Sequence, residues 1–174
     1  MKKVNNILKL LTWNNQSFPI GSYSFSSGLE YAIESNIINS ALELQDWLKG
    51  LINFGSLKTD AMLLSEAWRL NKKKKYTTIL KLNDFAVSLN QSYEKYIENH
   101  EQGKAFIKIT SDTWNHYFVC KQLLYPIAFA CSAVQEDISL EDTIICFLHA
   151  SLCNLLSAGI KLIPLGQTDG QKIQ

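Results

Sequence analysis

The segment from Thr143 to Pro164 constrains the fold more than any other part of this sequence. It is long enough and apolar enough to cross a membrane as a single helix. A helix that is apolar on most of its sides lies either in a bilayer or at the centre of a helical bundle. Because the rest of the chain supplies ample apolar surface to cover it, we expect a central bundle helix over residues 140–162 and no membrane span. Polar side chains that interrupt the segment also favour the bundle: His149, Ser151, Asn154, Ser157 and Lys161.

Helix signals recur along the chain, whereas strand signals are weak. Val4, Ile7, Leu8 and Leu11 have the i, i+3, i+4, i+7 spacing that predicts an amphipathic first helix. With the other periodic segments, this pattern predicts about eight helices joined by short connections. We find no internal repeat and no inter-domain linker, so the expected fold is an all-α, single-domain bundle over residues 1–174.

Helix starts are predicted by three local patterns. Ser40 with Glu43 forms a capping box, and Ser139 with Asp142 forms a weaker one before the long apolar segment. Pro126 suits the first turn of another helix, where its missing N–H is no loss. These patterns place the helix boundaries independently of the apolar periodicity.

Composition and charge exclude several classes of protein. Seventeen basic and sixteen acidic side chains leave a net charge of +1. The chain therefore lacks the large positive charge that would indicate nucleic-acid binding. The N-terminus lacks the apolar run and cleavage site of a secretory signal. The four cysteines form no C-x-x-C pair and lie in apolar stretches. We therefore expect a compact cytoplasmic protein with reduced, buried thiols.

A search for catalytic motifs finds none. The chain lacks the phosphate loop, the dinucleotide fingerprint, H-E-x-x-H and G-x-S-x-G. Ser92 and Lys95 match S-x-x-K, but the companion motifs of acyl-serine enzymes are missing. Glu94 and Glu98 form a carboxylate pair at helical spacing, which we interpret as a solvated helix face shared with Lys95. We expect neither enzyme activity nor a cofactor.

One alternative remains open within the long apolar segment. Cys146, His149 and Cys153 are spaced i, i+3, i+7, which places two thiols and an imidazole on one face of a helix. Such ligands suit Ni, Cu and Zn, so a helical metal-binding protein or enzyme is the competing hypothesis. A closed site needs a fourth ligand, and burial opposes the thiolate form. We therefore interpret the three as packed core residues and predict no metal site.

The most unusual local sequences carry a family resemblance. The run Pro19–Glu30 reads PIGSYSFSSGLE and resembles the UreF signature P-x-G-x-[FY]-S-x-S-x-G-L-E. Leu162–Gln171 reads LIPLGQTDGQ and resembles that family's L-x-P-L-G-Q-T-D-G-Q. Gln102–Ala105 is similar to its Q-G-R-A, with Lys for Arg, and Tyr125–Phe129 contains its P-[VI]-A-[FY]. The matches occur in order and are jointly specific.

The resemblance implies a function as well as a fold. UreF proteins are all-α urease accessory proteins that dimerise and bind a UreD-type partner, also called UreH. That pair recruits the UreG GTPase, and the complex docks on apo-urease for nickel insertion. The resemblance thus implies a chaperone without chemistry of its own, in which partner proteins handle nickel and GTP.

The two matching loops are the predicted partner-binding sites, because loops dense in Ser, Gly and aromatic residues usually carry binding. We expect Gly28 to need φ > 0 and Thr168 with Gln171 to cap one further helix. The predicted partner-binding residues are Pro19, Gly21, Tyr23, Ser24, Ser26, Gly28, Glu30, Lys161, Gly166, Gln167, Thr168, Gly170 and Gln171.

The sequence departs from the family pattern at three places. Tyr93 and Tyr96 stand where family members often carry Arg, and Lys161 stands where Arg is usual. Lys161 keeps the charge but loses the bidentate fork. Family chains also continue into a further helix and an Arg-rich tail. We therefore expect this 174-residue form to be truncated, to fold, and to recruit partners weakly.

Overall fold

The computed structural model describes residues 2–22 and 27–173 of the chain. Within these ranges it contains nine α-helices and no strand. The predicted all-α bundle of about eight helices is confirmed, and the short final helix is the ninth. The helices are α1 (Lys2–Trp13), α2 (Leu29–Glu34), α3 (Ala41–Asn53), α4 (Ser56–Lys72), α5 (Tyr76–Ser88), α6 (Tyr93–Trp114), α7 (Tyr125–Gln135), α8 (Leu140–Leu162) and α9 (Gln167–Ile173).

Both predicted capping patterns mark helix starts. Ser40 Oγ accepts a hydrogen bond from the backbone N–H of Glu43 at 3.3 Å, at the start of α3. Ser139 Oγ accepts one from the N–H of Asp142 at 3.0 Å, at the start of α8. Each bond satisfies one of the N–H groups that the first turn of a helix leaves unpaired.

The larger of two hydrophobic clusters is built around aromatic rings. The ring of Phe106 in α6 lies 5.7 Å from that of Trp13 in α1 and 5.5 Å from that of Phe129 in α7. These three side chains are fully buried. Phe147, from the first half of α8, adds its ring 5.5 Å from Phe129.

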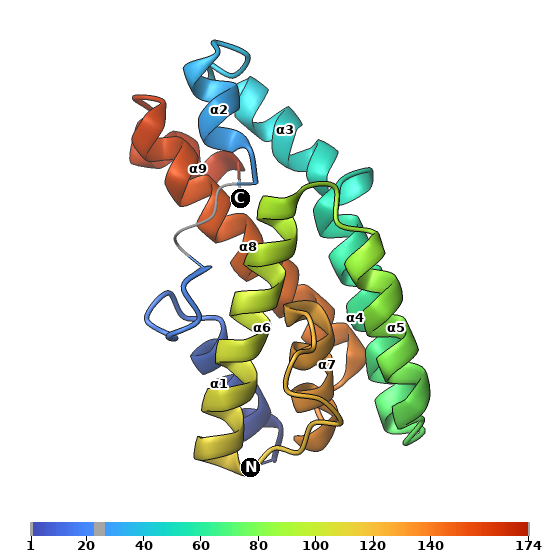
Figure 1. Ribbon diagram of the computed structural model, residues 1–174. Coiled ribbons are helices and arrows are strands. Elements are labelled where there is room, and N and C mark those ends of the chain that lie inside the picture. The colour runs from blue at the N-terminus through green and yellow to red at the C-terminus, as the bar shows by residue number, and fades with distance from the viewer. Residues whose placement is uncertain (1, 23–26, 174) are drawn as a thin grey trace.

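A smaller hydrophobic cluster fills the other end of the molecule. Leu29 of α2 and Leu44 of α3 are fully buried there against Leu155 and Leu156, from the second half of α8. Figure 1 shows α2, α3 and α9 gathered at this end, with α8 running from it towards α1 and α7. The helix predicted to be central therefore contributes to both clusters.

The predicted amphipathic first helix is confirmed, but its apolar face is exposed. Val4, Ile7, Leu8 and Leu11 lie on one face of α1, as their spacing requires, but they are 46% to 61% exposed. Buried instead are Leu10 and Trp13, together with the partly buried neighbours on that face. Periodicity identified the apolar face, but the large ring of Trp13 decides which face enters the core.

The long helix α8 is less buried than predicted. By length and composition it could cross a membrane, and 28% of its apolar 18-residue window is buried in the protein. The expectation that His149 would be mostly buried is wrong, because its side chain is exposed, and Asn154 is only partly buried. Neighbouring helices cover part of the circumference of α8, and Ile145 is left 57% exposed.

Gly103 permits the closest helix packing in the larger cluster. A Cβ at this position would overlap the carbonyl oxygen of Leu123 and would lie 2.9 Å from the backbone nitrogen of Tyr125. The Gln102–Ala105 motif of α6 therefore meets the start of the Tyr125–Phe129 motif of α7. Only a residue without a Cβ allows this approach.

Candidate functional site

The described residues of the first motif loop, 18–22 and 27–30, connect to α1 and α2, and part of them packs on the bundle. Phe18 and Ile20 are buried, and the Phe18 ring lies 5.8 Å from that of Phe106. Gly21 has φ +73° and Gly28 has φ +80°, so the predicted left-handed backbone at Gly28 is confirmed. No atom lies within 4 Å of a Cβ built on either glycine. Backbone conformation, and not lack of space, therefore explains both glycines.

The described residues of this loop divide into anchors and exposed positions. Pro19, Gly28 and Glu30 are exposed, and Gly21 is partly buried. The predictions for Tyr23, Ser24 and Ser26 fall on residues 23–26, which lie outside the described residues. The loop thus presents the motif residues Pro19, Gly28 and Glu30 at the surface while Phe18 and Ile20 hold it to the core.

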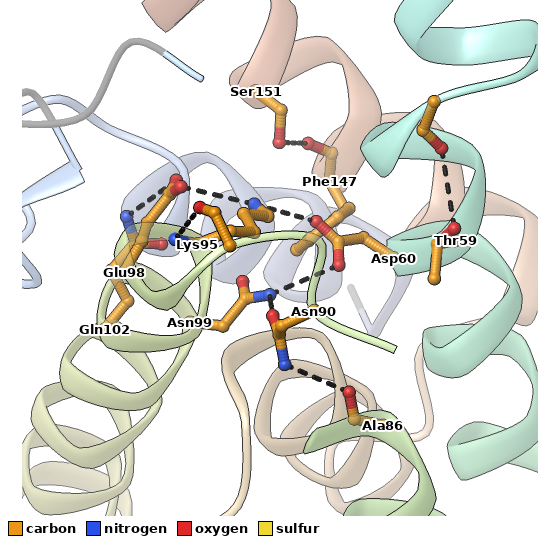
Figure 2. A network of polar contacts seen from close by, with 12 residues as sticks. Thr59, Asp60, Ala86, Asn90, Lys95, Glu98, Asn99, Gln102, Phe147 and Ser151 are labelled. Carbon is orange, nitrogen blue, oxygen red and sulfur yellow. Dashed lines mark hydrogen bonds and ion pairs between the residues drawn. The ribbon is translucent and has the colours of Figure 1, made fainter. Parts of the chain in front are cut away.

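A buried polar cluster lies next to this loop, between α4 and α6. Lys95 Nζ lies 3.2 Å from Asp60 Oδ2 and 3.3 Å from Glu98 Oε2. Asn99 Nδ2 donates to Asp60 Oδ1 at 3.5 Å, and Gln102 Nε2 donates to Glu98 Oε1 at 3.4 Å. Figure 2 shows Lys95 between the two carboxylates, with Asn99 directed at the other oxygen of Asp60. We call these five residues the polar cluster.

Burial and charge set the protonation of the polar cluster. Burial opposes a charge on Lys95, but the carboxylates of Asp60 and Glu98 outweigh it and raise the lysine pKa above its usual value. Burial raises the pKa of Glu98, and the attraction of Lys95 offsets only part of that rise. One ammonium therefore neutralises one of two buried carboxylates, and the second is held at an energetic cost.

A cavity of about 50 Å³ separates the polar cluster from the loop. Its wall includes Ser22 and Ser27 from the loop, Asp60 and Glu98 from the cluster, and Asn154 from α8. A space of this size admits water molecules but no organic substrate. The space between the loop and the polar cluster therefore offers no substrate pocket.

The predicted environment of two members of this cluster is wrong. Glu98 and Lys95 were predicted on a solvated face, but their side chains are 15% and 16% exposed. The S-x-x-K match has a structural explanation, because Ser92 Oγ caps α6 by accepting from the N–H of Lys95 at 3.1 Å. Asp60 comes from a different helix, and sequence spacing cannot show that the fold brings it to Glu98. The signal available in the sequence was that Gln102, a member of the cluster, belongs to the Gln102–Ala105 motif.

The second motif segment reverses the chain after α8. Ile163 is buried and ends α8, and the carbonyl of Gly166 accepts hydrogen bonds from the N–H groups of Asp169 at 3.0 Å and Gly170 at 3.3 Å. Helix α9 therefore starts at Gln167. The prediction that Thr168 caps this helix is wrong, because Thr168 lies inside its first turn.

The residues of this segment also divide into packed and exposed positions. Gly170 is buried, and a Cβ there would overlap the Ile160 side chain of α8, so its role is close packing. Lys161, Gly166, Thr168 and Gln171 are exposed. Ile173 packs against the smaller hydrophobic cluster, which also contains Leu29. The second segment and the α2 end of the first loop therefore lie at the same end of the molecule (Figure 1).

The residues of the metal-site alternative are only partly brought together. His149 Nε2 lies 3.5 Å from Cys153 Sγ. Burial raises the pKa of both Cys146 and Cys153, which disfavours thiolates. In the part of the chain that the structure describes, no three His, Cys, Asp or Glu side chains are placed to hold a metal ion. Of the four thiols, only that of Cys131 is fully buried as expected.

Comparison with known proteins agrees with the motif segments. The chain matches the model of the UreF family over residues 38–174. It is 36% identical to the urease accessory protein UreF of Rhodopseudomonas palustris (strain TIE-1), over 96% of this chain and 72% of the relative. It is 35% identical to that of Bradyrhizobium diazoefficiens, with the same coverage. The chain therefore belongs to the UreF family, whose role is in urease maturation.

Proposed function

We propose that this chain is a non-enzymatic scaffold in urease maturation. With a UreD-type (UreH-type) partner it recruits a UreG-type GTPase to apo-urease and couples the GTPase state to nickel insertion. Nickel and GTP are handled by the partner proteins, and the chain acts in the cytoplasm as a homodimer. Family membership supports the maturation role.

The observation that carries the proposal is the convergence of the two motif segments. They lie far apart in the sequence, but Leu29 at the end of the first segment and Ile163 of the second pack in the same smaller hydrophobic cluster. Their exposed positions include the polar side chains of Glu30, Lys161 and Thr168. Specific polar residues on a surface, held by buried anchors of the same motifs, are typical of a protein–protein contact.

The polar cluster supports the scaffold in preference to the enzyme. Asp60 and Glu98 resemble paired catalytic carboxylates, but Lys95 occupies the space between them. The adjoining cavity of about 50 Å³ is too small for a substrate. Because removing one of these charges would leave the others buried without a partner, the cluster fixes how α4 packs on α6.

Exposed apolar side chains support the homodimer. Val4, Leu8 and Leu11 form a continuous face on α1, and each is more than half exposed. Apolar side chains gathered on one helix face indicate a contact surface, because isolated proteins rarely leave such a patch in water. A second copy of this chain covers this face in the proposed dimer.

Co-expression with the UreD-type and UreG-type proteins tests the proposal. We expect the three proteins to co-purify and the combined variant Thr168→Ala, Gln171→Ala to weaken the complex by about 1–3 kcal/mol, the cost of unpaired interface hydrogen bonds. The matched control is Thr77→Ala with Gln91→Ala, two exposed residues outside the motif segments. Equal complex formation by both double variants would remove the second motif segment from the interface.

A further inference from the structure

A groove of about 660 Å³ lies between the second half of α6 and the segment 116–122 that follows it. None of the motif loops contributes to it. Its apolar wall contains Ile107 and Phe118, and the exposed ring of Tyr117 stands at its edge. The volume falls within the range of small-molecule sites in proteins.

Three lysines surround this groove. Lys104 and Lys108 lie one turn apart on α6, and Lys121 comes from the segment 116–122. None of the three forms an ion pair with another side chain in the described ranges, 2–22 and 27–173. Asp112 is the one acidic residue among those lining the groove, so two positive charges are in excess. The groove therefore combines an apolar wall with uncompensated positive charge.

The base of the groove is held rigidly. His116 Nδ1 lies 2.9 Å from Ser132 Oγ, and its Nε2 lies 2.8 Å from Glu136 Oε1. The same carboxylate pairs with Lys9 of α1. Burial lowers the pKa of His116 despite the attraction of Glu136. Because both ring nitrogens have partners, His116 presents its ring to the groove as a fixed, neutral surface.

The length of the groove indicates the size of its occupant. Its α6 residues run from Lys104 to Asp112, which is about 12 Å along a helix. A stable protein interface takes some 20–30 residues from each partner. A site of this length and volume suits a small molecule.

We propose that this groove binds a small organic anion. The apolar or aromatic body of the ligand packs between Ile107, Tyr117 and Phe118. Its carboxylate, sulfonate or phosphate group lies among the ammonium groups of Lys104, Lys108 and Lys121. Because the three lysines are exposed, each ion pair contributes little alone, and together they add to the apolar contact of the ligand body.

Two fluorescent probes that differ by one charged group test the proposal. 8-Anilinonaphthalene-1-sulfonate carries a sulfonate, and N-phenyl-1-naphthylamine has the same ring system without it. We expect saturable binding of the sulfonate probe and affinity for the neutral probe that is about tenfold weaker. Backbone amide resonances of residues 104–122 should shift on titration with the sulfonate probe. Equal affinity for the two probes, or shifts elsewhere alone, would overturn the proposal.

Matched variants locate the charge effect. Replacing Lys104, Lys108 and Lys121 with Gln should reduce affinity for the sulfonate probe about tenfold and leave the neutral probe unaffected. The control replaces Lys49, Lys81 and Lys172 with Gln, which removes the same charge from exposed positions elsewhere. All six lysines are exposed, so both triple variants should keep the wild-type melting temperature. Equal loss of affinity in the two variants would show a general charge effect and contradict the assigned site.

The exposed face of α1 is the competing site for such a probe. The variant Leu8→Ser, Leu11→Ser removes apolar surface there and should leave the affinity for the sulfonate probe unchanged. If this variant abolishes binding while the groove variant retains it, the probe occupies α1 and the proposal fails.

Discussion

Lys95 Nζ lies 3.2 Å from Asp60 Oδ2, so a single ion pair joins α4 to α6 inside the molecule. Both side chains are largely withdrawn from water, at 16% and 7% exposure. The geometry has different consequences from those of a surface pair, because removing one partner leaves the other charge buried.

Replacing Lys95 with Met should lower the free energy of unfolding by about 3 kcal/mol, because Asp60 and Glu98 then repel each other without a cation. Chemical denaturation at neutral pH measures this loss. Lys81→Met, at an exposed position of α5, should change the value by less than about 0.5 kcal/mol. A Lys95 variant as stable as that control would show that the cluster does not hold the helices together.

Glu98 and Glu136 should give the stability opposite dependences on pH. Burial raises the pKa of Glu98, so its contribution is fully present below pH 4.5 and is lost as pH rises through the raised value. Burial also acts on Glu136, but Lys9 and His116 outweigh it and lower the pKa. The contribution of Glu136 is therefore present above pH 4.5 and is lost as pH falls through the lowered value.

Urea denaturation of the wild type, Glu98→Gln and Glu136→Gln between pH 4 and pH 7 checks these signs. As pH rises, the free energy of unfolding of the wild type should fall relative to that of Glu98→Gln. Over the same range it should rise relative to that of Glu136→Gln. Parallel profiles for the two variants would contradict the burial assigned to Glu98.

Replacing Gly103 with Ala should cost on the order of 2–4 kcal/mol of stability, because the new Cβ meets the backbone of Leu123 and Tyr125, which cannot rotate away. Gly50→Ala is the matched control. Gly50 lies inside α3, and a Cβ there has no atom within 4 Å, so the change should stabilise by about 0.5–1 kcal/mol. Thermal melts of the two variants should therefore shift in opposite directions.

Gly28→Val should lower the melting temperature through the backbone alone. Its φ of +80° is costly for a β-branched residue, by about 1–2 kcal/mol, although the space around it is open. Gly28→Asn should retain more stability than Gly28→Val, because Asn adopts the left-handed conformation more readily. Equal melting temperatures for the two variants would show that the turn does not require this conformation.

The variant Leu8→Ser, Leu11→Ser should convert the proposed dimer to a monomer with little change in the stability of the fold, because both side chains are more than half exposed. Light scattering after gel filtration measures the mass. The control is Leu89→Ser, a partly exposed leucine after α5, which should leave the mass unchanged. A wild-type chain that is monomeric at high concentration would contradict the dimer proposal.

The sequence predicted the helices well, because caps such as Ser40 and breakers such as Pro164 act locally. It predicted burial poorly wherever tertiary packing decides. His149 was expected inside but is exposed, and the apolar face of α1 is exposed as well, because periodicity shows that an apolar face exists without showing what covers it.

The candidate site was predicted in part, for a similar reason. Gly28 could be assigned a left-handed backbone from the loop sequence, and the structure confirms it. The meeting of Asp60 with Lys95 and Glu98 depends on how α4 and α6 cross, which no spacing along the chain encodes. Thr168 was misassigned as a cap because Gly166, two residues earlier, supplies the carbonyl that starts α9.

Helix α8 places Phe147 in one hydrophobic cluster and Leu155 in the other. Because a helix moves as a unit, any shift of α8 changes its contacts in both clusters at the same time. A slide by one turn, about 5.4 Å, would withdraw both side chains from their neighbours at once. The second motif segment packs on the second cluster through Ile163, whereas Phe18 and Ile20 of the first loop pack in the larger, aromatic cluster. Helix α8 therefore couples the packing at one end of the molecule to the packing at the other end.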